Sequence, residues 1–383
     1  MLEKIIINNI NSIKNAEIDF KKGSYKFGED NIVENIVNPM ALYGHNGSGK
    51  TSVFLALDSL IKIMNQASAE LRPFVVNYFL YNKYQQAKEN VRNEDDISGS
   101  ITLSFSLNND NYEYFISTSM LAYIRKEYLK FNSKIIFERN KEGSTYGGKF
   151  VSFDDNYNLV PMLRSLASSE INNQIIQDAY SYISSFTFLS LPQINKGYFV
   201  TSKVFNNIGY ADLLVKKAEE IEDILKTYKE FPVFKVKKKS ELVGINAPIS
   251  QFVFEVQDGS FKGELPFSLL SAGMRNQAIL LSILVSIPEN SVVFVDELEQ
   301  ALHPSAIKSF LEVVKKKKIQ LVFSSHNTYI LQMLRPDQVY FTHWHEGFSK
   351  CSRLSKIYPN IREINNIEKM YLSSVFDEAI KNG

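Results

Sequence analysis

The stretch from Gly44 to Thr51, Gly-His-Asn-Gly-Ser-Gly-Lys-Thr, is the feature of this 383-residue chain that most restricts its fold. It fits the pattern G-x-x-x-x-G-K-S/T and follows the apolar run Pro39–Tyr43. In this pattern glycines let backbone N–H groups turn inward around phosphates, and a helix that begins at the lysine adds its positive end. The sequence therefore predicts a nucleoside triphosphate site on a strand, loop and helix.

Each residue of this phosphate loop has an expected task. Lys50 can reach the β and γ phosphates, and the Thr51 hydroxyl can bind Mg²⁺. No pattern in the sequence reads the base, so ATP and GTP are not distinguished. The expected nucleotide ligands are His45, Asn46, Gly47, Ser48, Gly49, Lys50, Thr51 and Ser52.

Polar residues follow two further apolar strands. Asp296 comes directly after Ser291–Val295 and can hold the hydration shell of Mg²⁺, and the next residue, Glu297, can orient or deprotonate the attacking water. His326 follows the apolar run Ile319–Ser324, where an imidazole can sense the γ-phosphate. Because ligands of open α/β sheets bind at the carboxyl ends of the strands, we expect these side chains to meet the phosphate loop.

Composition excludes several classes of protein. Hydrophobic residues at 44% and charged residues at 22% are ordinary for a globular chain and argue against wholesale disorder. Lys and Arg number 43 against 42 acidic residues, so no global electrostatic footprint for nucleic acid is visible. The single cysteine, Cys351, fits a reducing interior. With no long apolar run and no signal-peptide pattern, we expect a soluble, cytoplasmic protein without membrane contact.

Periodicity predicts antiparallel hairpins, helices and a parallel unit. A spacing that calls for a parallel crossover joins the strands before Asp296 and His326, through a helix near residues 304–316. Residues 159–185 and 211–230 have helical patterns. The expected hairpins pair residues 4–10 with 16–20, 100–107 with 112–117, and 251–256 with 263–267.

The order of the motifs resembles the heads of ABC-type ATPases, which include the RecF, Rad50, SMC and OLD-like proteins. Within that group the chain is most similar to the stand-alone "AAA family" ATPases of bacterial anti-phage and abortive-infection loci. Residues 60–230 match only in general layout. The segments that carry the resemblance are Gly44–Thr51, Leu270–Arg275, Val295–Pro304, Ser324–Asn327, Arg335–Phe341 and Ile367–Ser373.

This resemblance implies an ATP sandwich between two copies. Ser271 and Gly273, in a Ser-x-Gly signature, would cap the γ-phosphate held by the loop of another subunit, so two chains make two shared sites. Met274 departs from the glutamine or threonine that relatives often carry, which would weaken hydrolysis. Glu299 and His303 would lie in the segment that contacts the partner's site, although a structural role is favoured for each. The glutamine of the family's Q-loop is not placed, with candidates at Gln85, Gln86, Gln174 and Gln177.

The expected fold is an α/β, ABC-type P-loop ATPase head with a mixed sheet, an antiparallel subdomain and an inserted helical lobe. Residues 1–155 would form the N-terminal part of the ATPase lobe, with the phosphate loop and the hairpins. Residues 156–235 would form the helical lobe. Residues 236–383 would carry the signature, the acidic pair and the histidine switch.

Two functions remain open. The first is an ATP-binding and hydrolysing switch that dimerises or forms a higher oligomer around ATP and Mg²⁺. It would control a separate nuclease or toxin encoded in the same locus, with a phage-derived trigger. The alternative is a RecF-like DNA-binding ATPase of repair or recombination. The lysine runs 235–239 and 315–318 could meet DNA, yet a solvated face explains them better, and His343-Trp344-His345 lacks further metal ligands.

Overall fold

The structure is a computed structural model of this chain. It describes residues 1–65, 98–119, 123–151, 160–169, 171–190, 200–201, 219–220, 223, 233–242, 248–258, 261–266, 269, 280–281, 283–300, 304–363 and 365–376.

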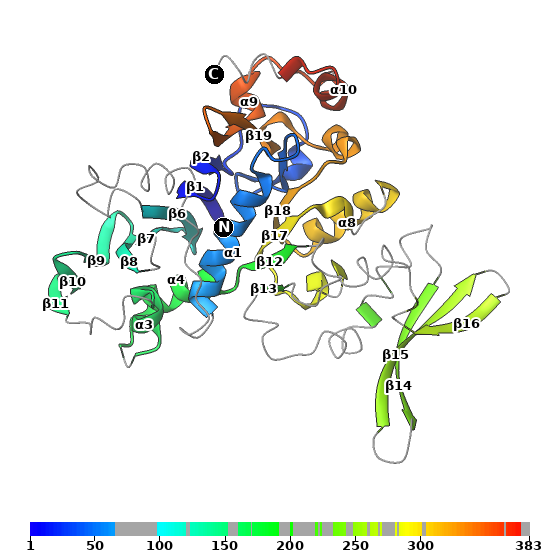
Figure 1. The fold of residues 1–383 in the computed structure, drawn as a ribbon, viewed down its shortest axis with the longest axis horizontal. Coiled ribbons are helices and arrows are strands. Elements are labelled where there is room, and N and C mark those ends of the chain that lie inside the picture. Colours follow the sequence, from blue (N-terminus) through cyan, green and yellow to red (C-terminus); the bar gives the residue numbers. More distant parts are fainter. Residues whose placement is uncertain are drawn as a thin grey trace.

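One mixed sheet of fifteen strands organises the described residues (Figure 1). Its order is β11-β10-β9-β8-β7-β6-β1-β2-β20-β19-β5-β18-β17-β12-β13. The strands in chain order are β1 (Leu2–Ile10), β2 (Ile13–Asp19), β5 (Met40–Tyr43), β6 (Ser98–Leu107), β7 (Asp110–Ser119), β8 (Ile124–Phe131), β9 (Lys134–Asn140), β10 (Gly143–Tyr146), β11 (Lys149–Val151), β12 (Thr187–Ser190), β13 (Val200–Thr201), β17 (Val292–Asp296), β18 (Gln320–Ser324), β19 (Val339–His345) and β20 (Phe348–Arg353).

Helices cover the parallel half of this sheet on both faces. The parallel strands are β19, β5, β18, β17 and β12, and they are buried from end to end except for the last residues of β19. Short fully buried strands of this kind are typical of a sheet covered on both sides. The helices are α1 (Lys50–Asn65), α3 (Met162–Ala167), α4 (Gln174–Ser184), α8 (Pro304–Lys316), α9 (Leu354–Ile357) and α10 (Ile367–Leu372), with 3-10 turns at Glu29–Asn31, Leu298–Gln300, Thr328–Met333 and Pro336–Gln338.

Alternate residues of the parallel strands enter two different cores. Val292 and Phe294 of β17 point into the core that contains α1, α3 and α4, while Val293 and Val295 point into the core that contains α8. This is the period-two alternation of a strand, here apolar on both sides. The two cores hold the sheet rigidly, and only the loops at its edges are left to carry chemistry.

Helix α1 follows directly from the phosphate loop. Its residues Val53, Phe54, Leu57 and Ile61 are fully buried, and their spacing of one, three and four residues makes one apolar stripe. That stripe packs on the face of the sheet shared with α4, and the end of α1 is held where Asn65 Nδ2 donates to the carbonyl of Ser184, at 3.0 Å. The start of α1 is therefore fixed relative to the carboxyl ends of the parallel strands.

The antiparallel half, β1, β2 and β6 to β11, extends to the left in Figure 1. The two predicted hairpins in this region are confirmed, because β1 pairs with β2 and β6 with β7. The strands from β8 to β11 were not predicted from the sequence. They continue the same meander through tight turns, and their buried residues, such as Leu129 and Phe137, join the core around α1.

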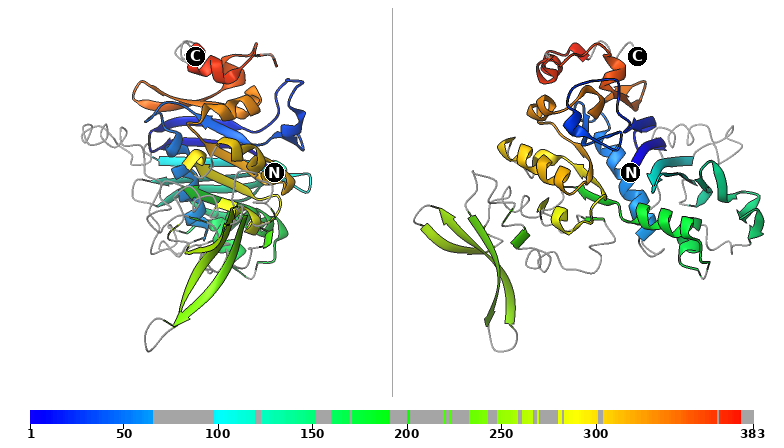
Figure 2. Two further views of the ribbon diagram at one scale, coloured as in Figure 1. Left: turned by 90° about the vertical axis from the view of Figure 1, so that its right-hand side faces the viewer. Right: turned by 180° about the vertical axis from the view of Figure 1, so that it is seen from behind.

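A second, three-stranded sheet lies apart from the main body in Figures 1 and 2. It consists of β14 (Val233–Leu242), β15 (Pro248–Asp258) and β16 (Phe261–Pro266). The predicted hairpin of β15 and β16 is confirmed. The lysine run 235–239, interpreted as a solvated charged face, belongs to the strand β14. A two-stranded ribbon, β3 (Ile32–Val33) with β4 (Ile36–Val37), completes the strands of the described residues.

The structure describes only part of the predicted helical lobe, residues 156–235. Helices α3 and α4 lie within the helical pattern of residues 159–185, but β12 follows at once and enters the main sheet beside β17. The apolar residues of β12, Phe188 and Leu189, form too short a run for hydrophobic periodicity to distinguish a strand from the end of a helix. Most of the predicted helix 211–230 lies outside the described residues, so the three-part division stays a prediction. No helix in the described ranges has the length and apolarity to cross a membrane.

A buried acid joins the antiparallel strands to α3. Glu127 of β8 has no exposed surface, and its carboxylate accepts the N–H groups of Met162 and Leu163 at 2.6 and 2.9 Å and the hydroxyl of Tyr114 at 3.0 Å. These N–H groups begin α3 and have no partner within the helix. Burial raises the pKa of Glu127, although its hydrogen bonds and Arg139 oppose that shift.

This acid makes stability depend on pH in a definite direction. Because the folded pKa of Glu127 exceeds its unfolded value, the folded state holds the proton longer. The free energy of unfolding should therefore fall as pH rises between the ordinary glutamate pKa and the raised folded value, by up to about 1.4 kcal/mol per pH unit. In urea titrations Glu127→Gln should flatten this slope, whereas the exposed Glu142→Gln should keep it; identical slopes for wild type and Glu127→Gln would contradict the assignment.

A buried ion pair near the C-terminal part of the sheet holds the segment that follows β2. Arg335 is 1% exposed and bonds Asp337 at 2.9 Å, and its other donors reach the carbonyls of Tyr25 and Phe27. Asp337 also accepts the N–H of Gly23 at 2.7 Å. Every charge in this pair is therefore satisfied, which is the condition for a buried pair to hold segments together.

Candidate functional site

The phosphate loop lies against β19 and β20 at the carboxyl edge of the parallel strands. Gly44, Gly47 and Gly49 have positive φ angles of 150°, 75° and 105°, conformations that residues with side chains rarely adopt. The loop is tied to β19 where the hydroxyl oxygens of Ser48 and Thr342 lie 2.6 Å apart. The loop is thus shaped by its glycines and held by a neighbouring strand.

Gly49 is also the point where the loop touches β20. A Cβ atom at Gly49 would lie 2.2 Å from Ser349 Oγ, while one at Gly47 would meet nothing within 4 Å. Both positions have positive φ, so the pair separates the steric contact from the backbone strain. Gly49→Ala is expected to cost roughly 1–3 kcal/mol more in the free energy of unfolding than Gly47→Ala, measured with urea. Equal costs for the two variants would show that the contact with β20 is not tight.

Lys50 is buried at the start of α1, with 6% of its surface exposed. Its ammonium donates to the carbonyl oxygens of Gly44 and His45 at 2.8 and 3.1 Å, so it folds back across the loop. Burial lowers the pKa of Lys50, and the carboxylates of Asp296, Glu299 and Glu297 oppose that shift. The ammonium of Lys50 therefore lies between the loop carbonyls and a cluster of acids.

Asp296 ends β17 beside this lysine and is 3% exposed. It accepts the hydroxyl of Ser324, the last residue of β18, at 2.5 Å, and Thr51 lies near enough to lower its pKa. Burial raises the pKa of Asp296, while the bond to Ser324, the nearby Thr51 and the charge of Lys50 lower it. The predicted magnesium ligands Thr51 and Asp296 therefore lie close together.

These two residues fit a magnesium ion. Mg²⁺ takes oxygen ligands and is usually bound by one or two protein groups together with phosphate oxygens and water. A hydroxyl and a carboxylate that lie close together at the start of α1 provide such a pair of oxygens. Among the described residues no group of three or more His, Cys, Asp and Glu side chains has the arrangement of a metal site.

Glu297 turns the chain away from β17. It has φ of 57°, a left-handed conformation that is unusual for a residue other than glycine, and its N–H donates to Ser324 Oγ at 2.8 Å. Burial raises the pKa of Glu297, and the neighbouring charges of Asp296 and Glu299 add to the effect. Strained backbone of this kind often marks functional positions, where it aims one side chain.

His326 follows β18 on the same edge and is exposed. Its backbone N–H donates to Glu299 Oε1 at 2.9 Å, which ties the loop after β18 to the 3-10 turn after β17. Burial of part of the ring and the charge of Lys50 lower the pKa of His326. The predicted convergence of Lys50, Asp296, Glu297 and His326 on one edge is thus present in the fold.

Some predicted residues cannot be placed. Ser271, Gly273, His303, Gln85 and Gln86 lie outside the described residues. The other glutamine candidates lie on α4 and have local partners: Gln174 Nε2 donates to Asp178 at 2.7 Å and Gln177 Nε2 to the carbonyl of Ala167 at 2.7 Å.

The structure adds a fourth strand end that the sequence did not reveal. β12 pairs in parallel with β17, and Ser190, its last residue, lies opposite Asp296. Gln193 follows three residues later, outside the described residues. The signal was present as a short apolar run before Gln193, but nothing in the sequence said that this run joins the sheet beside β17.

The sequence also missed a row of hydroxyls beneath the loop. Ser349 Oγ donates to Ser12 Oγ at 2.7 Å, and Ser12 Oγ lies 2.8 Å from Ser52 Oγ in the first turn of α1. Ser12 belongs to the turn between β1 and β2, so this row connects the antiparallel half to the nucleotide loop. Lone serines give no sequence signal, and only the pairing of strands brings them together.

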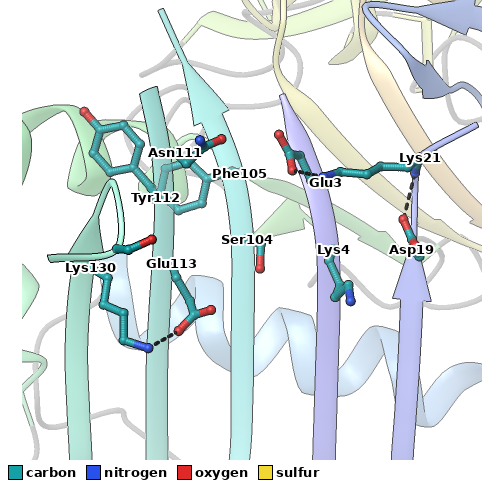
Figure 3. Close-up of a pocket in the computed structure, with 11 residues that line it drawn as sticks. Glu3, Lys4, Asp19, Lys21, Ser104, Phe105, Asn111, Tyr112, Glu113 and Lys130 are labelled. Carbon is teal, nitrogen blue, oxygen red and sulfur yellow. Dashed lines mark hydrogen bonds and ion pairs between the residues drawn. The ribbon is translucent and has the colours of Figure 1, made fainter. Parts of the chain in front are cut away.

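A cavity of about 560 Å³ lies on the antiparallel half of the sheet (Figure 3). Four of its charged side chains form two ion pairs: Lys130 bonds Glu113 at 2.7 Å, and Lys21 bonds Glu3 at 2.9 Å. The other two also have partners, because Lys4 bonds Glu17 at 3.3 Å and Asp19 accepts the backbone N–H of Lys21. None of the predicted nucleotide ligands lines it. We therefore assign the chemistry to the edge of the sheet that carries the phosphate loop and not to this cavity.

The chain resembles solved structures of SMC heads. These are "Crystal structure of the SmcHead bound to the C-winged helix domain of ScpA" (12% identity, 91% of this chain and 96% of that one, TM-score 0.49), the SMC head domain from Thermotoga maritima (12%, 92% and 98%, 0.44), and the Smc head domain with an extended coiled coil bound to the C-terminal domain of ScpA, derived from Pyrococcus furiosus (13%, 93% and 97%, 0.47). TM-scores at this level carry no argument about activity.

Sequence comparison is more specific. No curated protein matches the sequence. A profile of the family described as "AAA domain, putative AbiEii toxin, Type IV TA system" matches residues 40–332, which is most of the chain and includes the phosphate loop, the acidic pair and His326. The chain therefore belongs to this family of AAA domains.

Proposed function

We propose that this chain binds ATP with Mg²⁺ and hydrolyses it, and that the nucleotide state switches its assembly. The observation that carries the proposal is the meeting of Lys50, Thr51 and Asp296 at one edge of the sheet. A buried lysine, a hydroxyl and a buried carboxylate are the groups that hold a triphosphate and its metal. Burial lowers the pKa of Lys50 and raises that of Asp296, so both shifts favour the neutral forms. A bound triphosphate beside Lys50 and a metal ion beside Asp296 would favour the charged forms again, which fits a nucleotide site.

The residues of the chain divide the work. The loop N–H groups and Lys50 bind phosphate oxygens, and Thr51 and Asp296 hold the ion. The bound ion would neutralise charge on the phosphates. Glu297, raised in pKa beside two other acids, positions the attacking water and accepts its proton. His326 lies where it can contact the γ-phosphate, and the bond from its backbone to Glu299 transmits that contact to the turn after β17.

A second copy of the chain completes the site in this proposal. The described edge provides the loop, the acids and the histidine from one side and leaves His326 and the tip of the loop exposed. Ser271 and Gly273 of the second copy would cap the γ-phosphate with backbone N–H groups at a helix start. Assembly would then depend on ATP and reverse on hydrolysis.

The switch would control a separate effector in anti-phage defence. The family description names an AbiEii-type toxin system, which supports such a role. The alternative is a RecF-like ATPase that binds DNA directly. The balanced composition, 43 basic and 42 acidic residues, does not favour DNA over a protein partner.

A pull-down in the host separates these roles. Tagged Glu297→Gln protein, expected to stay closed on ATP, is isolated with ATP and Mg²⁺, and Lys50→Ala serves as the matched open control. A protein encoded in the same locus that is retained only by Glu297→Gln supports the switch. DNA retained only by Glu297→Gln, and lost in high salt, supports the alternative.

A further inference from the structure

A cavity of about 510 Å³ adjoins the phosphate loop on the side of β19. Its walls are the loop residues Gly44–Ser48, the end of β19 from Phe341 to His345, and Tyr371 in α10. None of the four side chains that define the γ-phosphate end, Lys50, Asp296, Glu297 and His326, lines it. The cavity is therefore next to the loop but away from the hydrolytic groups.

The strand order sets the direction of a bound nucleotide. Asp296 and His326 follow β17 and β18, which lie on one side of β5, and β19 and β20 lie on the other side. The γ-phosphate belongs with the acids and the histidine. The remainder of the nucleotide must then leave the loop on the opposite side, over the end of β19 and β20, where the cavity opens.

Trp344 lies at the end of β19, where the base and ribose of the nucleotide would leave the loop. It pairs with Ser349 across the β19–β20 hairpin, and directly opposed residues of antiparallel strands share one face. Ser349 touches Gly49 of the loop and is linked through Ser12 to Ser52 in the first turn of α1. Trp344 is 49% exposed, lines the cavity, and is the single tryptophan of the chain.

We propose that Trp344 is the platform on which the nucleobase stacks, and that the cavity beside the loop holds the base and ribose. The inference rests on the proposed binding of a triphosphate by the same loop. An exposed indole one strand away from the loop offers a flat apolar surface, and every base has a face to place on it. Stacking is indifferent to base identity, which agrees with a sequence that carries no base-reading pattern.

Calorimetric titration with two ligands tests this platform. The ligands are magnesium adenylyl imidodiphosphate, which has a base, and magnesium tripolyphosphate, which has none. Trp344→Ala should weaken binding of the analogue roughly 5- to 150-fold and leave the affinity for tripolyphosphate unchanged. Trp344→Phe should restore most of the loss. Tyr123→Ala, which removes another half-exposed aromatic ring remote in sequence from the loop, should behave as wild type.

Fluorescence gives a second readout, because all tryptophan emission comes from one residue. The analogue should change the emission of the wild-type protein, and tripolyphosphate should change it far less. An equal effect of Trp344→Ala on both ligands, or none on either, overturns the base platform while leaving triphosphate binding intact. Failure of the wild-type protein to bind either ligand overturns the nucleotide site itself.

Discussion

Lys50→Ala is expected to abolish nucleotide binding. Lys50 is the one cation that the described structure places at once beside the loop carbonyls, Asp296 and Glu297. Without it the phosphates lose a charged donor and face the acids uncompensated, so the dissociation constant should rise at least about 100-fold. Titration calorimetry with the magnesium salt of a nonhydrolysable ATP analogue measures the change.

A matched control separates this effect from a general loss of charge. Lys134→Ala removes an exposed lysine from the antiparallel half and should leave the affinity unchanged. Circular dichroism should give both variants the spectrum of the wild type, because Lys50 bonds only loop carbonyls in its own turn. Binding by Lys50→Ala at wild-type affinity would contradict the assignment of the loop.

Glu297→Gln should bind ATP normally and lose turnover. The amide keeps the size and the left-handed backbone of Glu297 but cannot accept a proton from water. General base catalysis contributes about 100- to 10,000-fold, and the rate of phosphate release should fall within that range. The effect should appear in kcat, because the glutamate acts on water and not on nucleotide affinity.

The control for this variant is Glu289→Gln, which changes an exposed acid before β17. It should hydrolyse ATP at the wild-type rate. Ordinary phosphate release by Glu297→Gln would remove Glu297 from the mechanism. In that case Glu299, whose Oε2 is buried and has no hydrogen-bond partner among the described residues, would be the acid to examine next.

The sequence predicted the site better than the lobes. The loop, the acidic pair and His326 each follow an apolar run, and strand ends in a parallel sheet meet at one edge whatever lies between them. That is why residues as far apart in the chain as Lys50 and His326 could be brought together without knowledge of the intervening chain. The helical pattern of 159–185 was equally readable, because apolar residues recur at helical spacing in α4.

What the sequence could not predict depends on contacts between distant strands. β12 is four residues long, and a short apolar run has no periodicity that separates strand from helix. The hydroxyl row of Ser12, Ser52 and Ser349 exists only because β20 pairs with β2 beside the loop. Trp344 entered the sequence analysis only within a His-Trp-His run that lacks further metal ligands, because its place beside the loop follows from the β19–β20 register and not from its neighbours in sequence.

A structure of the Glu297→Gln protein with ATP and Mg²⁺ tests most directly whether the loop edge grips a triphosphate that a second copy completes. We predict phosphates inside the loop on Lys50, the ion on Thr51 and Asp296, and Ser271 of the second copy facing the γ-phosphate. At saturating nucleotide, an empty loop, or a γ-phosphate that no second copy approaches, would contradict this account.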